Sequence, residues 1–378
     1  MNIKNILEEM ISRGGSDLHL KAGLQPVVRV DGKLTHLDFD RPRPKDMEEI
    51  ADQILTPAQK DRFKKTREVD FAFGVSGLAR FRANFYVQRG SIAMVFRHVP
   101  VEIKSVDELS LPEVIKKLSM LQRGLIFVTG TVGSGKSTTL AAMVREINEK
   151  ANKNIITIED PIEFLHQDRK SLINQREIGS DTTSFHEALR HILRQDPDVI
   201  LIGEIRDALT MEIALMAADT GHLVLSTLHT VDATQTINRV ISFFPPHQHQ
   251  EIRYLLSSTL QSVISQRLIP VKEGAGRVPA VEVMVVTSTI REYIIDPEKT
   301  PLIQQAIREG VTSHGMQSFD QSLMHLLTSG GISMEEAMSN SSNPHEFSLR
   351  LKGIQATSDK TWDSFEEAET GGGSAGEL

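Results

Sequence analysis

The chain has 378 residues, of which 39% are hydrophobic and 24% are charged, with a formal net charge of −8 at pH 7 and no cysteine. This length exceeds what one ordinary hydrophobic core uses and predicts two domains plus a tail, while the negative charge argues against a broad nucleic-acid-binding surface. The missing cysteines exclude disulfides, thiolate catalysis and cysteine-ligated zinc, and the lack of a long apolar stretch or a secretory signal predicts a cytoplasmic protein without a transmembrane helix.

Residues 1–98 predict a small α+β domain. Its first 13 residues place five apolar side chains on one side of an amphipathic helix. Period-two patterns and turn residues then predict strands and one further helix. The expected strands cover residues 17–20, 26–30, 33–37, 69–73, 79–88 and 91–98, and the expected helix covers residues 44–66.

The pattern changes after residue 98. Residues 99–112 hold two prolines and several charges, which predicts a linker that could act as a hinge. Residues 113–290 show apolar strands alternating with helices, which is typical of an α/β domain whose parallel sheet is covered on both faces. Residues 291–354 predict a helical C-terminal region, and residues 355–378 lack apolar periodicity and predict a disordered tail. The strands expected in the α/β domain cover residues 124–129, 155–159, 199–203, 223–227 and 281–286.

The most specific motif is GTVGSGKS at residues 130–137, a Gly-x-x-x-x-Gly-Lys-Ser sequence between a predicted strand and a helix expected over residues 136–149. The backbone N–H groups of such a loop and the helix N-terminus form a cradle for anions. Lys136 is expected to reach the β- and γ-phosphates, and Ser137 to offer its hydroxyl to Mg²⁺. The chain is therefore expected to bind a nucleoside triphosphate. The expected contacts are Gly130, Thr131, Val132, Gly133, Ser134, Gly135, Lys136, Ser137 and Thr138.

Three apolar segments after this loop end in acids or histidines, and α/β sheets bind their ligands at the carboxyl ends of their strands. Each carboxylate taken alone could also be a solvated strand end. The three segments together favour a hydrolytic site, because a triphosphatase needs a Mg²⁺ ligand and a carboxylate that orients water. The segments are ITIEDPIEF with Glu159, Asp160 and Glu163, DVILIGEIR with Glu204, and TGHLVLSTLH with His222 and His229.

These segments resemble the Asp box, Walker B motif and His box of the secretion-superfamily ATPases, the hexameric motors of type II secretion, type IV pili and type IV secretion. The resemblance implies a RecA-like P-loop ATPase core, a smaller N-terminal α+β domain of the PAS-like type and a helical C-terminal region. It implies that Glu163 is the catalytic carboxylate that orients water, that Lys136 contacts the phosphates in catalysis, and that Glu204 holds Mg²⁺ directly or through water. It also implies that His222 and His229 contact the nucleotide and couple its state to the sheet.

Arginines of the N-terminal domain are further candidates for the site. Arg80 and Arg82 alternate on one predicted strand and therefore share one of its faces, and Arg97 lies on the next strand. These side chains could also form an ordinary solvated sheet face. In ring ATPases an arginine commonly offsets the charge of the γ-phosphate. The resemblance therefore implies that all three contact the nucleotide, within the subunit or from a neighbour, whereas Arg194 and Arg206 are weaker candidates.

Two further stretches, GGSDLHLKAGLQPVVRVDGKL near the start and HGMQSFDQSL near the end, resemble the pilus-retraction branch of these ATPases. Assembly motors usually carry a long N-terminal docking region and a four-cysteine zinc module, and this sequence shows neither. The resemblance implies an ATP- and Mg²⁺-dependent homohexamer that retracts type IV pili. It would act from the cytoplasmic side, peripheral to the inner membrane at the pilus base, on a platform protein in that membrane.

Other functions remain open at this point. Residues 289–300 depart from the helix that is typical of the retraction branch, which leaves room for an auxiliary retraction role. An assembly, secretion or conjugation ATPase would share the same fold. A nucleic-acid translocase would share the RecA-like core, but the acidic charge and the absence of a basic, aromatic-rich run argue against it. A regulator that binds nucleotide without hydrolysis is disfavoured by the two glutamates at the strand ends.

Overall fold

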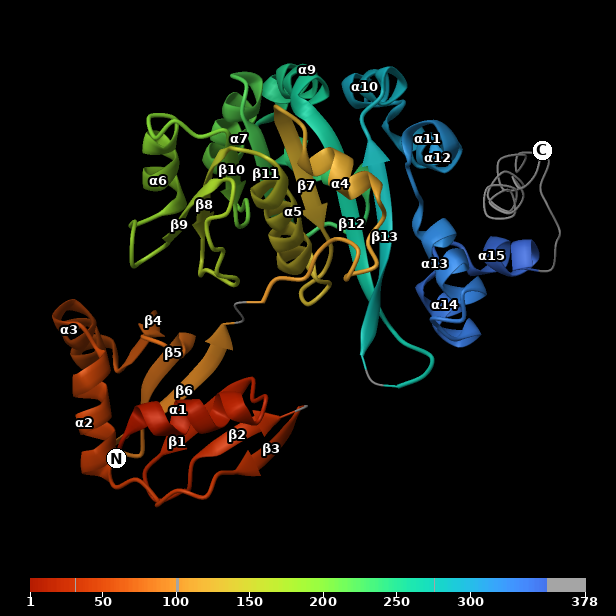
Figure 1. Cartoon of the computed structure of the whole chain (residues 1–378). Coiled ribbons are helices and arrows are strands. Elements are labelled where there is room, and N and C mark those ends of the chain that lie inside the picture. The colour runs from red at the N-terminus through yellow and green to blue at the C-terminus, as the bar shows by residue number, and fades with distance from the viewer. Residues whose placement is uncertain (31, 100–101, 275, 352–378) are drawn as a thin grey trace, which may run out of the picture. The chain divides into compact units, whose positions relative to one another are not determined.

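The computed structural model describes residues 1–30, 32–99, 102–274 and 276–351 (Figure 1). The chain divides into two compact units. The first unit consists of Met1–Glu102, Pro161–His166 and Glu177–Thr183, and the second consists of Ile103–Asp160, Gln167–Arg176 and the residues from Ser184 onward. The predicted disordered tail, residues 355–378, lies outside the described residues.

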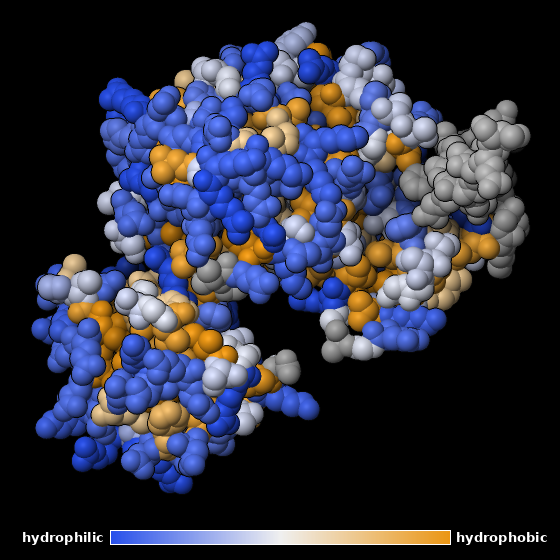
Figure 2. Space-filling model, in the orientation of Figure 1, coloured by the Kyte–Doolittle hydropathy of each residue, from blue (hydrophilic) through white to orange (hydrophobic). Residues whose placement is uncertain are grey.

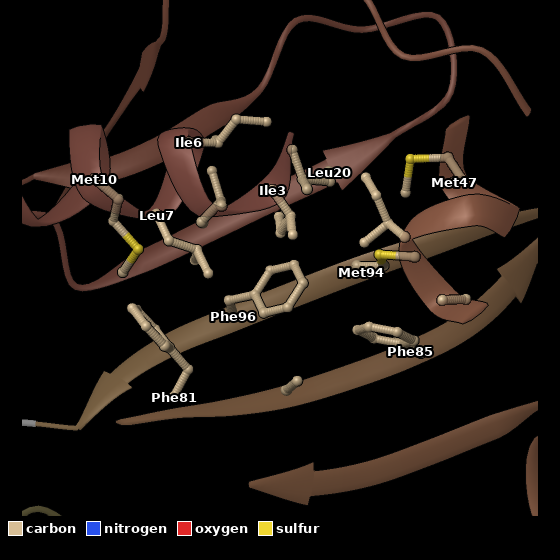
Figure 3. Packing of buried hydrophobic residues seen from close by; sticks show 14 of the residues in the cluster. Ile3, Ile6, Leu7, Met10, Leu20, Met47, Phe81, Phe85, Met94 and Phe96 are labelled. Atoms are coloured by element: carbon tan, nitrogen blue, oxygen red, sulfur yellow. The ribbon is translucent and has the colours of Figure 1, made fainter. Parts of the chain in front are cut away.

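The first unit contains a six-stranded sheet in the order β3-β2-β1-β6-β5-β4, and all neighbouring strands are antiparallel. Alternate residues of a strand point to opposite sides, so one face of this sheet is apolar and the other is polar. Phe81, Phe85 and Phe96 of the apolar face pack against helices α1 and α2 (Figure 3). The elements are α1 Ile3–Ser12, β1 Asp17–Lys21, β2 Val27–Val30, β3 Lys33–His36, α2 Pro44–Ile54, α3 Pro57–Thr66, β4 Glu68–Val75, β5 Ala79–Gln88 and β6 Ser91–Val99.

The single helix expected over residues 44–66 is wrong, because the structure has two helices, α2 and α3, in its place. The break has a local cause. Pro57 begins α3 and has no backbone N–H, and the residue before a proline avoids helical geometry. Thr56 caps α3 by accepting a hydrogen bond from the Gln59 N–H, and the Gln59 side chain accepts one from the Thr56 N–H over 2.9 Å.

The second unit contains a seven-stranded sheet in the order β13-β12-β7-β11-β10-β8-β9. The strands from β12 to β8 run parallel, and β13 is antiparallel to β12. The sequence pattern predicts five of these strands, whereas β9 and β12 are not predicted. The strands are β7 Gly124–Thr129, β8 Asn154–Glu159, β9 Leu172–Glu177, β10 Val199–Ile202, β11 Leu223–Leu228, β12 Leu260–Pro270 and β13 Arg277–Val285.

Helices cover both faces of this sheet. Ile126 and Val128 of β7 pack in one hydrophobic cluster with α4, Val114–Ser119, and α5, Lys136–Lys150. Leu125 and Phe127 point to the opposite side and are fully buried, and α7 packs against β7 and β11. The remaining helices of this region are α6 Phe185–Ile192, α7 Ala208–Asp219, α8 Ala233–Ser242 and α9 His249–Thr259.

Part of the predicted linker is built into the second unit. The unit begins at Ile103, and Val106 and Leu111 are buried in the same hydrophobic cluster as Ile115 of α4. Strand β6 extends the first unit to Val99. Residues 103–112 of the predicted linker therefore belong to the second unit.

The C-terminal region is helical, as the sequence predicts. Phe319, Leu323 and Phe347 form a small core with Ile269 of β12. Within the described residues, no helix is both long enough and apolar enough to cross a membrane. The face drawn in Figure 2 is mostly hydrophilic, with scattered apolar patches. The helices are α10 Ser288–Ile295, α11 Ile303–Glu309, α12 Val311–His314, α13 Phe319–Thr328, α14 Met334–Asn340 and α15 Pro344–Leu351.

Candidate active site

The Gly-rich motif forms the turn between β7 and α5. Gly133 and Gly135 adopt the left-handed backbone region, with φ angles of 78° and 92°, and Gly135 is the N-cap of α5. Gly130 has a φ of 143°, and a Cβ at this position would lie 2.5 Å from the carbonyl oxygen of Gln266 in β12. The path of the loop therefore requires glycine. It leads to the N-terminus of α5, where unpaired backbone N–H groups favour an anion.

Lys136 is only 9% exposed although it carries a charge. Its Nζ donates to the carbonyl oxygens of Gly130 and Thr131, each over 2.9 Å, so the side chain bends back over its own loop. Ser137 and Thr138 follow in the first turn of α5 and are half-buried. An ammonium group, hydroxyl groups and helix N–H groups thus meet at one turn, which is a set of groups that fits the phosphates of a nucleotide.

Glu204 and His229 lie at the same edge of the sheet as the loop. Glu204 follows β10, His229 follows β11, and the last residue of β11 pairs with Thr129 at the end of β7. The His229 Nε2 lies 3.2 Å from one carboxylate oxygen of Glu204, whose side chain is 17% exposed. The guanidinium of Arg206 pairs with the other oxygen. The structure therefore brings together the two residues that the sequence assigns to the Walker B motif and the His box.

Glu159 is a second carboxylate at this edge. It ends β8, which pairs with β10 in parallel. Its Oε1 accepts hydrogen bonds from the Thr157 hydroxyl over 2.7 Å and from the Gln175 amide over 3.1 Å. These two donors hold the carboxylate in place next to the strand that carries Glu204.

His222 lies at the opposite edge, and its predicted role as a nucleotide contact is corrected here. Its carbonyl oxygen accepts a hydrogen bond from the N–H of Gly124, the first residue of β7, whereas the phosphate loop follows the last residue of that strand. At about 3.3 Å per strand residue, the two positions are about 20 Å apart. The His222 Nδ1 instead lies 2.9 Å from the carbonyl oxygen of Ala217. A direct contact with a nucleotide on the loop of the same chain is therefore excluded.

The predicted arginines lie on the polar face of the sheet in the first unit. Arg82 of β5 and Arg97 of β6 are direct neighbours in the strand pairing. The Arg97 Nε donates to the Asp17 carboxylate over 2.7 Å. Burial alone would raise the pKa of Asp17, but hydrogen bonds from Ser16 and Arg97 outweigh it, and the pKa lies below its ordinary value. Asp17 therefore stays charged and holds Arg97 against the sheet.

Glu163 belongs to the first unit and not to the unit that carries the loop. One of its carboxylate oxygens lies 3.9 Å from the Arg82 guanidinium, and both side chains are partly exposed. His166, three residues later, is half-buried, and its partial burial lowers its pKa to about 4. The third predicted arginine, Arg80, pairs with Glu177 over 3.2 Å. The structure thus brings the predicted catalytic carboxylate together with one of the predicted arginines.

Two buried polar residues near these groups were not predicted. Gln266 is 3% exposed, and its Oε1 has no hydrogen-bond partner in the part of the chain that the structure describes. Its amide nitrogen lies 3.9 Å from the place where a Cβ of Gly135 would be, so it sits directly beside the phosphate loop. Glu177 is 2% exposed. The only sequence signal for Gln266 is a polar residue inside an apolar run, and no motif marks Glu177.

Comparisons with known proteins identify the family. Residues 101–339 match the family described as type II/IV secretion system protein. The chain belongs to this family. Two proteins of Pseudomonas aeruginosa are similar to it: the type IV pilus retraction ATPase PilT is 46% identical over 92% of this chain and 100% of PilT, and the type IV pilus ATPase PilU is 38% identical over 93% of this chain and 92% of PilU. A crystal structure of the pilus retraction motor PilT with bound ADP matches with a TM-score of 0.85 and 44% identity, over 92% of this chain and 98% of that one.

Membership in the type II/IV secretion system family agrees with the geometry of the site. The predicted ATPase fold is confirmed, and its Gly-rich loop lies between β7 and α5, at the same edge of the sheet as the strand-end carboxylates. The chain is an ATPase of this family.

Proposed function

We propose that this protein is a hexameric motor that hydrolyses Mg-ATP to retract type IV pili. The observation that carries the proposal is similarity to PilT along nearly the whole of both chains, combined with a complete phosphate loop and the acidic strand ends beside it. The motor works from the cytoplasmic side of the inner membrane at the pilus base and acts on a platform protein in that membrane. Alternating hydrolysis and release moves its two units relative to each other and drives pilus disassembly.

Each residue of the site has a role in this proposal. Lys136 contacts the β- and γ-phosphates after leaving the loop carbonyls that it bonds here. Ser137 and Glu204 would hold Mg²⁺, the latter directly or through water, and the ion would supply positive charge beside the phosphates. Glu163 orients the attacking water. Arg82 and Arg97 offset negative charge at the γ-phosphate, and His229 links Glu204 to β11.

A retraction motor and an assembly motor predict opposite phenotypes for a chromosomal deletion in the source organism. We expect the deletion strain to carry many pili that do not retract, with retraction restored by the wild-type gene and not by Glu163→Gln. Pilus number by electron microscopy and retraction by live imaging are the measurements. Cells without pili would show that the protein is an assembly motor.

A specific observation keeps an auxiliary retraction role as the second candidate. Helix α10 presents Arg291 and Glu292 to solvent next to the buried Ile290. Its sequence departs from the helix that is typical of the pilus-retraction branch. Normal pili and normal retraction in the deletion strain would favour this second role. Loss of retraction only when a second motor gene is also deleted would establish it.

A further inference from the structure

The Glu163 segment is interleaved with the second unit in sequence but belongs to the first unit in space. It follows β8 of the seven-stranded sheet, yet Pro161–His166 and Glu177–Thr183 group with the N-terminal sheet. Neither stretch is a helix, and only the first residue of the second stretch belongs to a strand. Side-chain contacts are therefore needed to hold both stretches on the first unit.

Glu177 connects the pieces. One of its carboxylate oxygens accepts hydrogen bonds from the Arg80 guanidinium and from the backbone N–H of Ile162, both over 3.2 Å. Its other oxygen accepts one from the Ser180 hydroxyl over 3.2 Å. The Glu177 N–H donates to Asp181 over 2.8 Å. One carboxylate therefore joins strand β5, its own turn and the residue directly before Glu163.

Burial makes this connection hard to replace. The Glu177 side chain is 3% exposed and that of Arg80 is 25% exposed. A carboxylate this deeply buried depends on its cationic partner. Removal of Arg80 leaves the buried charge of Glu177 unpaired, and removal of Glu177 loses the hydrogen bond to the backbone of Ile162. The other two arginines differ. Arg97 is 63% exposed, and Arg82 is 35% exposed and lies 3.9 Å from Glu163.

We propose that Arg80 is a positioning residue that acts through Glu177 to hold the Glu163 segment on the N-terminal sheet, and that it does not contact the nucleotide. The inference rests on the proposed assignment of Glu163. Glu163 and Arg82 then form one rigid set on the first unit. Arg80 is thereby separated from Arg82, although both lie on the same face of β5.

The test is a double-mutant cycle in the full-length protein with Arg80→Ala, Glu177→Ala and the double variant. Each single change should lower kcat by about tenfold or more and leave the Kd for mant-ATP with Mg²⁺ within about twofold, because the phosphate loop is untouched. The double variant should be no slower than Glu177→Ala, because the two residues act as one tie. Arg80→Lys should recover part of kcat, because it restores a cation beside the buried carboxylate.

Hydrogen exchange of the Ile162 amide gives a second measurement that does not depend on turnover. This N–H is bonded to Glu177, so its exchange should accelerate in Arg80→Ala and in Glu177→Ala. Lys60→Ala is the matched control, since it removes an exposed ion pair with Asp52 in the same unit, and it should change neither kcat nor exchange.

A direct role of Arg80 at the nucleotide would give a different pattern. Arg80→Ala would then weaken mant-ATP binding, Glu177→Ala would not, their effects on kcat would multiply, and Ile162 exchange would stay slow. This pattern would overturn the inference. Unchanged turnover in Glu163→Gln would instead contradict the assignment of Glu163, and the Ile162 exchange would still report whether the tie exists.

Discussion

Lys136 and Glu163 lie in different units, so replacing them should damage different steps of the reaction. Lys136→Ala removes the ammonium group of the phosphate loop and should weaken mant-ATP binding by about tenfold or more. Glu163→Gln keeps the shape of the side chain but not its basicity, and it should bind mant-ATP normally while turnover falls by about 100-fold or more. Phosphate release and fluorescence titration measure the two effects. Near-normal turnover in both variants would contradict the site.

Gly130 offers a second test at the scale of a single atom. Gly130→Ala would place a Cβ 2.5 Å from both the Gln266 carbonyl oxygen and the Ser134 hydroxyl, and its φ of 143° is strained for an alanine. The loop must shift, so we expect loss of mant-ATP binding in a protein with an unchanged circular dichroism spectrum. Gly23→Ala is the control, since its φ is also positive, at 80°, but nothing lies within 4 Å of the added Cβ. Equal binding by both variants would show that the loop tolerates the contact.

At the scale of elements, the strands that could be predicted are those with alternating apolar residues in the first unit and those with mainly apolar runs in the second. Strand β12 could not, because Ser262, Ser265 and Gln266 interrupt its apolar run. The structure buries these side chains, and the Thr129 hydroxyl of β7 donates to the Ser265 hydroxyl over 2.9 Å. A buried hydroxyl is acceptable only next to such a partner, and the partner comes from a distant part of the sequence.

The difference between local patterns and distant partners also separates the site residues that could be predicted from those that could not. Glu204 and His229 could be predicted because each lies just after an apolar strand, where the edge of a parallel sheet collects such residues. Lys136 could be predicted because it belongs to the Gly-rich motif that follows another apolar strand. His222 also lies next to an apolar strand, but it precedes β11 instead of following it, so it lies at the opposite edge of the sheet. The partner of Arg80 is 97 residues away in sequence, and no local pattern reports a pairing at that range.

Glu282 of β13 ties this strand to α8 by accepting a hydrogen bond from the Ala233 N–H over 2.8 Å. Burial raises its pKa from 4.5 to about 7, with a smaller contribution from Asp232, although the Ala233 N–H, Gln304 and Arg267 oppose the shift. The folded protein therefore keeps a proton that the unfolded chain loses above pH 4.5. The stability linked to this proton is complete below about pH 4.5 and is lost as the pH rises through about 7.

Glu282→Gln should remove this pH dependence, because the amide oxygen can still accept from Ala233 and never ionises. We expect the variant to gain on the order of 1–3 kcal/mol in the free energy of unfolding at pH 8 relative to pH 5. Urea unfolding at the two pH values measures it, with Glu212→Gln on the exposed face of α7 as the control. An equal change in both variants would mean that Glu282 is not the group responsible.

At the scale of the whole molecule, the proposed ring makes each subunit depend on two neighbours. Interfaces in a closed ring are heterologous, so a unit that cannot move constrains the next subunit. In rings assembled from equal amounts of wild-type and Glu163→Gln protein, we expect ATP turnover well below half of the wild-type rate. Independent subunits would give about half. Mixing with Lys60→Ala should leave the rate unchanged, and native mass spectrometry verifies that the rings are mixed.

The path of the chain between its two units also limits how such a gene can recombine. The chain crosses from one unit to the other five times, because the first unit borrows two short stretches from the middle of the sequence. A single crossover near codon 102 would pair a foreign N-terminal sheet with the resident 161–166 and 177–183 stretches. Arg80 of one parent would then face Glu177 of the other. Functional chimaeras should therefore exchange all three stretches of the first unit together. The part of the gene that must be inherited as a whole is thus discontinuous.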